Sequence, residues 1–152
     1  LTNIRQDLEE LIEGIEGKNV NLDAPYLIMP SRTKNALKFI TDSNGNFAFP
    51  GLHQENMDVV GIPVQVTNNI PTNLGAGNET EVMLVDATEV ILGEVEGLEL
   101  IVSSEGTYVT ASGTTVSAIQ RDQTLIRAVM RHDLAVRHPE AVAVKTGVTW
   151  GT

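Results

Sequence analysis

One stretch in the C-terminal third of the chain decides the fold, and it reads Leu125-Ile126-Arg127-Ala128-Val129-Met130-Arg131-His132-Asp133-Leu134-Ala135-Val136-Arg137-His138-Pro139-Glu140-Ala141-Val142. As a strand, it would place Ile126, Ala128 and Met130 on one face. As a helix, it would place Leu125 and Val129 on one side, so periodicity alone leaves both conformations open. The β-branched residues and the alternating arginines favour a strand over 122–137. A second strand is expected after the proline, over 141–148.

Upstream of residue 42, the pattern predicts two helices. The apolar residues that share one stripe of a helix over 2–16 are Ile4, Leu8, Leu11, Ile12 and Ile15. A short buried strand at 26–29 follows, and Ser31 is expected to cap a second helix over roughly 32–41.

From residue 58 on, the pattern changes to short strands separated by glycine and proline. Strands are expected at 59–67, 80–86, 89–93, 97–103 and 106–110. Residues 111–120 are rich in Ser, Thr and Gly and are expected to be a linker. Helices followed by strands predict an α+β fold in a single compact body with a mainly antiparallel sheet. The run 122–137 is expected to protrude from this body or to lie at its margin.

Composition and charge exclude several classes of function. The chain has 152 residues, 41% of them hydrophobic, and a net charge of −10. Residues 1–120 carry five basic and seventeen acidic side chains, whereas residues 121–152 carry five basic and three acidic ones. A general nucleic-acid binder needs a basic face, so the acidic excess of residues 1–120 argues against that role. Apolar runs fall short of the ~20 residues that span a membrane, so no membrane partner is expected. The absence of cysteine excludes disulfides and thiolate metal sites.

The three histidines are the first candidates for a metal or catalytic site. His132 and His138 are six residues apart, which puts them on different sides of a helix or ~20 Å apart on a strand. His53 could join them only through the fold. Arg131, His132 and Asp133 have the composition of a catalytic dyad, but neighbours on a strand point to opposite faces. Structural histidines are therefore expected.

Acidic residues and a glycine loop are the remaining candidates. The acidic positions dense enough to suggest a divalent-ion site are Asp86, Glu89, Glu94, Glu96 and Glu99. They do not follow the spacing of a calcium loop. The loop at 74–78 lacks the following helix that a phosphate cradle requires. We therefore expect no catalytic residues, no metal and no cofactor.

Four stretches, taken in order, resemble the major capsid proteins of tailed bacteriophages, whose shared architecture is the Hong Kong 97-type fold. They are Ala24–Ser31 with the helix that follows, Gly61–Pro71, Val85–Glu94, and the opening stretch through Val142. The order and spacing of the four make the set specific.

The resemblance implies an axial domain and part of a peripheral domain. Residues 1–120 would form the axial domain, 121–138 a strand of the peripheral domain, and 139–152 a strand returning to the axial domain. The family's N-terminal arm, extended loop and spine helix would lie before Leu1. The chain is therefore expected to be the C-terminal part of a longer subunit.

The resemblance also implies a function without catalysis, as the head subunit of a phage or prophage that self-assembles into an icosahedral shell around the genome. Its partners would be other copies of itself in pentamers and hexamers, together with scaffold, protease or portal proteins. It would be found in the virion capsid after assembly in the cytoplasm of the host bacterium. Some members of the family crosslink their shells covalently through an isopeptide bond between a lysine and an asparagine. Since no asparagine follows Asn78, we expect no such bond into 121–138, and mass spectrometry of intact particles is the check.

Two other functions stay open at the level of sequence. A β-rich adhesion or binding module is one, although a carbohydrate binder usually exposes more aromatic residues than Tyr26, Tyr108 and Trp150 supply. A small hydrolase is the other, and it would need a polar triad brought together by the fold.

Overall fold

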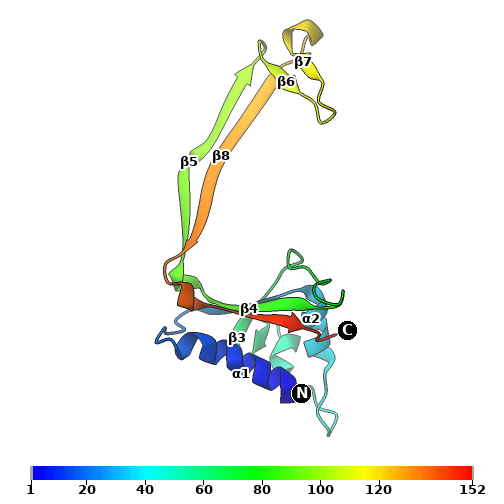
Figure 1. Cartoon of the computed structure of the whole chain (residues 1–152), viewed down its shortest axis with the longest axis vertical. Coiled ribbons are helices and arrows are strands. Elements are labelled where there is room, and N and C mark those ends of the chain that lie inside the picture. The colour runs from blue at the N-terminus through cyan, green and yellow to red at the C-terminus, as the bar shows by residue number, and fades with distance from the viewer. Residues whose placement is uncertain (1, 152) are drawn as a thin grey trace. The chain divides into compact units, whose positions relative to one another are not determined.

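The computed structural model describes residues 2–151, apart from the side chains of Thr2 and Glu96. The chain forms two compact units: one holds the residues up to Ile91 and from Val136 on, and the other holds Leu92–Ala135 (Figure 1). The expectation of a single compact body is therefore wrong, and the expected boundary at residue 120 falls inside the second unit. The reason is that the strands of 92–135 pair with one another, while the sheet of the first unit is complete without them.

The first unit is built on a five-stranded sheet. Its strands are β1 (Pro25–Met29), β2 (Asp58–Val59), β3 (Ile62–Val66), β4 (Thr80–Asp86) and β9 (Val142–Val148), in the spatial order β2-β3-β1-β4-β9. Only β1 and β3 run parallel among these described pairs. The predicted mainly antiparallel sheet is confirmed, and so is the strand predicted after Pro139.

Two helices cover one face of this sheet. They are α1 (Thr2–Glu16) and α2 (Ser31–Phe39), which confirms both helix predictions. Pro30, not Ser31, occupies the cap position of α2. The hydroxyl of Ser31 instead donates to Oδ1 of Asn68 at 2.6 Å. The helix ends earlier than predicted because Ile40 is already extended.

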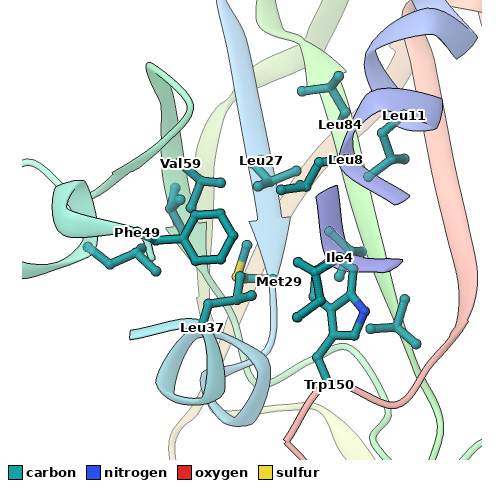
Figure 2. Packing of buried hydrophobic residues seen from close by; sticks show 14 of the residues in the cluster. Ile4, Leu8, Leu11, Leu27, Met29, Leu37, Phe49, Val59, Leu84 and Trp150 are labelled. Carbon is teal, nitrogen blue, oxygen red and sulfur yellow. The ribbon is translucent and has the colours of Figure 1, made fainter. Parts of the chain in front are cut away.

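The core lies between the helices and the sheet. Figure 2 shows Leu8 and Leu11 of α1 beside Leu27 and Leu84 of the sheet. The buried apolar side chains of this core are Ile4, Leu8, Leu11, Ile15, Leu27, Met29, Leu37, Phe49, Leu52, Val59, Val64, Val82, Leu84, Val148 and Trp150. The helical stripe predicted from spacing is therefore the buried face of α1, except that Ile12 is only partly buried. Most of the core is aliphatic, as the low aromatic content requires.

Three short 3-10 turns lie in the described connections of the first unit. The turns are η1 (Pro50–His53), η2 (Ala87–Glu89) and η4 (Pro139–Ala141). The predicted strand 59–67 is two strands, since Val60 and Gly61 both have positive φ and form the turn between β2 and β3. Valine is rare in such a turn, so the sequence does not predict the break between β2 and β3.

The second unit consists of two strand pairs. Strands β5 (Val90–Ser103) and β8 (Leu125–Val136) form one, and β6 (Thr107–Val109) and β7 (Thr115–Ser117) form the other. The strand predicted over 122–137 is confirmed. The two strands predicted at 89–93 and 97–103 are one, because pairing with β8 keeps the intervening glycines extended. The expected linker 111–120 contains β7 and a 3-10 turn, η3 (Ile119–Arg121).

Candidate functional site

The three histidines lie in three different settings. The ring of His53 stacks on Phe47 with centroids 4.2 Å apart, and its Nε2 lies 2.9 Å from the Lys38 carbonyl oxygen. His132 is exposed on β8 in the second unit, whereas His53 belongs to the first. Nδ1 of His138 lies 2.6 Å from Oε2 of Glu89.

The Arg131-His132-Asp133 sequence is exposed on β8 along its whole length. Oδ1 of Asp133 accepts a hydrogen bond from the next backbone amide, that of Leu134, at 2.9 Å. This carboxylate is therefore engaged with its own strand. Within residues 2–151, no three side chains of His, Asp or Glu gather closely enough to hold a metal ion.

The acidic cluster separates into residues with different surroundings. Asp86 is buried, Glu89 is half-buried, and Glu94 and Glu99 are exposed on β5. The side chain of Glu96 lies outside the described part of the structure. The described side chains of this cluster therefore do not form a common site.

The glycine loop at 74–78 is a closed turn. The backbone amides of Gly77 and Glu79 both donate to the Leu74 carbonyl oxygen, at 2.9 and 3.1 Å. The Arg32 guanidinium donates to the carbonyl oxygens of Thr72 and Asn78, at 2.9 and 2.8 Å. These bonds give the loop a structural role as the connection into β4.

Asp86 joins three segments at the end of β4. Its carboxylate accepts hydrogen bonds from the backbone amides of Asp23, Ala24 and Thr88 at 2.9, 3.3 and 2.8 Å, and from the Thr88 hydroxyl at 2.7 Å. Burial raises the pKa of Asp86, but these hydrogen bonds outweigh it and hold the pKa below its ordinary value of 3.8. The ionised carboxylate thus fixes the chain that enters β1.

Glu89 forms a second charged cluster where the chain leaves and re-enters the first unit. Its Oε1 and Oε2 accept hydrogen bonds from Nη2 and Nε of Arg137 at 2.7 and 3.0 Å. The backbone amide of Arg137 also donates to the Glu89 carbonyl oxygen at 2.8 Å. Hydrogen bonds from Arg137 and then from His138 lower the pKa of Glu89 to about 2. We call Glu89, Arg137 and His138 the ribbon clamp, because they connect the start of β5 to the end of β8.

The β5–β8 ribbon leaves many large apolar side chains exposed in the second unit. Its exposed large apolar side chains are Leu92, Val95, Leu98, Leu100, Ile101, Val102, Ile126, Met130 and Leu134. Neighbouring positions such as Leu100, Ile101 and Val102 point to alternate faces, so both faces of the ribbon are apolar. A two-stranded ribbon is marginal in water by itself, so this surface calls for a covering partner. Sequence reasoning predicted the strands but missed this surface, although consecutive apolar residues in β5 were the available signal.

Membrane insertion through a helix has no support in the described residues: neither α1 nor α2 combines the length and hydrophobicity that a bilayer-spanning helix needs.

Comparison with known proteins identifies the fold and the family. The model of the phage capsid family matches residues 3–147. The chain is 40% identical over 131 residues to the major capsid protein of Klebsiella oxytoca phage phiKO2, which covers 86% of this chain and 30% of that protein. It is 32% identical over 158 residues to the capsid polyprotein of Pseudomonas phage PAJU2, covering 98% of this chain and 23% of that protein. The chain thus spans less than a third of the length of these relatives.

Solved structures agree on the architecture. A capsid chain of an empty GTA particle aligns with a TM-score of 0.63 at 15% identity, over 92% of this chain and 41% of that one. A chain of Mycobacterium phage Ogopogo aligns with a TM-score of 0.63 at 16% identity, over 93% of this chain and 49% of that one. The SrpI encapsulin of Synechococcus elongatus aligns with a TM-score of 0.51 at 14% identity, over 94% of this chain and 49% of that one. The α+β fold is therefore of the Hong Kong 97 type, and the chain belongs to the phage capsid family.

Proposed function

We propose that the chain is the C-terminal part of a major capsid subunit that assembles with copies of itself into the icosahedral shell of a phage or prophage. The work of such a subunit is structural and involves no catalysis. Assembly would take place in the cytoplasm of the host bacterium, with pentamers and hexamers as the ring-shaped units. Scaffold, protease and portal proteins would be its other partners. Family membership and the names of the relatives support this role.

The observation that carries the proposal is the open apolar ribbon of the second unit. Leu98 on β5 is 59% exposed and Leu134 on β8 is 64% exposed. Monomeric soluble proteins rarely leave so continuous an apolar surface in water, whereas a shell subunit covers it with other protein. The polar side chains described above, such as Asp86 and Glu89, take part in contacts that hold segments of the chain together.

The two compact units also suggest how the subunit is divided. The first unit, with its five-stranded sheet, corresponds in this proposal to the axial domain, and the second unit corresponds to part of the peripheral domain. This division moves the ends of the first two segments from residues 120 and 138 to residues 91 and 135. The strand returning to the axial domain is then β9.

The test is to express the complete reading frame that contains these residues and to examine the product by electron microscopy and sedimentation. We expect closed shells of uniform diameter. Replacing Leu98 and Leu134 together by serine should abolish the shells while the subunit stays folded by circular dichroism. The matched control, Leu98→Met with Leu134→Met, keeps the apolar volume and should still form shells. A wild-type product that never forms shells, or a serine variant that forms normal ones, would overturn the proposal.

A further inference from the structure

A strained turn marks one exposed corner of the first unit. Val60 lies at the tip of the hairpin between β2 and β3 with φ of 55°, and its side chain is 70% exposed. A β-branched residue reaches this left-handed conformation only at a cost, and asparagine or glycine is the favoured residue there. Strain of this kind clusters at functional positions.

A groove, which we call the α1 groove, runs beside this turn. It has a volume of about 540 Å³ and is lined by Arg5, Leu8, Glu9, Ile12, Glu13, Glu16 and Val60. Its floor is apolar, from Leu8 and Ile12, and its rim is mostly acidic. The other acids of α1 are occupied, because Lys145 contacts Asp7 and Glu10 at 2.8 and 2.6 Å. By contrast, the rim acids Glu9, Glu13 and Glu16 take part in none of the ion pairs found within residues 2–151.

A surface of opposite character lies around α2 of the same unit. Phe39 is 70% exposed and Phe47 is 49% exposed, although the chain has only three phenylalanines. Lys34 and Lys38 lie four residues apart on α2, Lys38 directly precedes Phe39, and neither lysine joins an ion pair among the described side chains. In the neighbouring turn, Oδ1 of Asp42 accepts hydrogen bonds from the backbone amides of Asn44 and Asn46, both at 2.8 Å. We call Lys34, Lys38, Phe39 and Phe47 the α2 patch.

We propose that the α2 patch of one copy docks into the α1 groove of a second copy. The aromatic rings would cover Leu8, Ile12 and Val60, and the two lysines would meet the unpaired rim acids. The groove's own Arg5 would limit the contact to the acidic end of the rim. Exposed aromatic side chains set among complementary charges are typical of protein interfaces. A second copy is the occupant that brings both surfaces, because each copy carries one of each.

Such a contact is head-to-tail, because two different surfaces of the chain meet. Repeating it closes a ring when the rotation between copies divides a full turn, whereas a contact of one surface with itself stops at a dimer. This inference rests on the proposed function and names the surfaces that build its rings.

Engineered cysteines test the contact directly, because the chain has no cysteine of its own. The complete reading frame is made with Glu13→Cys, with Phe39→Cys, or with both in one chain. Mixing the two single variants under oxidation should give a disulfide-linked dimer, and the double variant should give a ladder of linked oligomers. Each single variant alone should stay unlinked. The matched control pairs Phe39→Cys with Gln65→Cys, an exposed position on the opposite face of the sheet, and should remain unlinked.

Charge exchange and relief of strain give independent readouts. Glu9→Lys with Glu13→Lys should reduce assembly, and so should Lys34→Glu with Lys38→Glu, while mixing the two variants should restore it. Val60→Asn should raise the melting temperature by about 2–4 °C, since it relieves the turn, and should lower the yield of linked oligomers. A purely structural role of Val60 would leave that yield unchanged.

The outcomes separate the two proposals. Shells that form normally without any Glu13–Phe39 linkage would overturn this inference and leave the proposed function standing. Linkage of Phe39→Cys to itself would also overturn it, since that result indicates a symmetric contact. Failure of the wild type to associate at all would overturn both.

Discussion

At the scale of single residues, two carboxylates hold together segments that are distant in the sequence. Asp86 is buried and ties the entry of β1 to the end of β4. Glu89 is closer to the surface and ties the two ends of the β5–β8 ribbon. Both have lowered pKa values because hydrogen-bond donors surround the ionised form.

The substitution Asp86→Asn tests the first of these. The amide keeps one acceptor but loses the charge, so we expect a loss of about 1.5–3 kcal/mol in the free energy of unfolding. Urea unfolding of the chain measures it. The control Glu13→Gln changes an exposed carboxylate and should shift the same quantity by less than about 0.5 kcal/mol. Equal effects of the two substitutions would contradict the assignment.

The pKa of Glu89 gives a prediction about pH. Since the folded pKa of about 2 lies below the ordinary 4.5, the ribbon clamp stabilises the fold fully above pH 4.5 and loses its effect as the pH falls through about 2. Carbon NMR of the Glu89 carboxyl group should therefore give a midpoint near 2. In Arg137→Ala the midpoint should move up toward the ordinary value. A wild-type midpoint near 4.5 would show that the clamp is not formed in solution.

At the scale of elements, α1 and the β5–β8 ribbon use apolar residues in opposite ways. α1 buries Ile15 completely against the sheet of its own unit. β8 leaves Ile126 71% exposed. The first kind of burial stabilises the folded chain by itself, whereas the second can contribute only when another surface covers the ribbon.

A matched pair of alanine substitutions separates these uses. Ile15→Ala should lower the free energy of unfolding by about 2–5 kcal/mol, because it empties part of a packed core. Ile126→Ala should change it by less than about 0.5 kcal/mol. Ile126→Ala should lower the yield of shells from the complete reading frame, because the covered ribbon then loses a contact. A strong effect of Ile126→Ala on unfolding of the chain alone would mean that the ribbon is already covered there.

The sequence predicted elements best where one physical rule acts alone. The stripe of α1 and the strand 80–86 follow helical and alternating periodicity, and both are confirmed. The single strand β5 was divided in two because Gly93 and Gly97 break isolated strands, while pairing with β8 holds them extended. β7 was missed because its residues 115–117 are polar at both ends and are specified by the hairpin with β6.

The contacts of the candidate sites depend on distances that no sequence pattern contains. In the sequence, Glu89 belongs to an acidic cluster, Arg137 belongs to the stretch 122–137, and His138 is a candidate ligand only together with His132. Their meeting requires the chain to return after the whole second unit, 48 and 49 positions later. The α1 groove was likewise invisible, since it needs the β2–β3 turn to come beside α1.

At the scale of the whole molecule, charge opposes assembly while shape and apolar surface favour it. The chain carries a net charge of −10, so like copies repel one another at long range. Salt screens that repulsion over about 8–10 Å near physiological strength, whereas partly buried pairs at a contact are screened much less. Salt should therefore promote association even where the contact itself is charged.

We accordingly expect the chain alone to be a monomer or weak oligomer in dilute low-salt solution. Its mass by light scattering should rise with both salt and protein concentration. The full subunit should form pentamers and hexamers through the same surfaces. A salt-independent closed ring of the chain at micromolar concentration would show that its first unit assembles without help from charge screening.

The ribbon clamp has a consequence for how such a chain can change over generations. The backbone hydrogen bond between Glu89 and Arg137 brings both ends of the second unit to one point on the first. The first unit therefore requires that the two ends of the ribbon meet, while its own sheet is complete without the strands between them. Insertions and deletions that keep β5 and β8 paired should thus cost the first unit little stability. A lineage can lengthen, shorten or exchange the ribbon, and so adjust the reach of each subunit, while inheriting the rest of the chain unaltered.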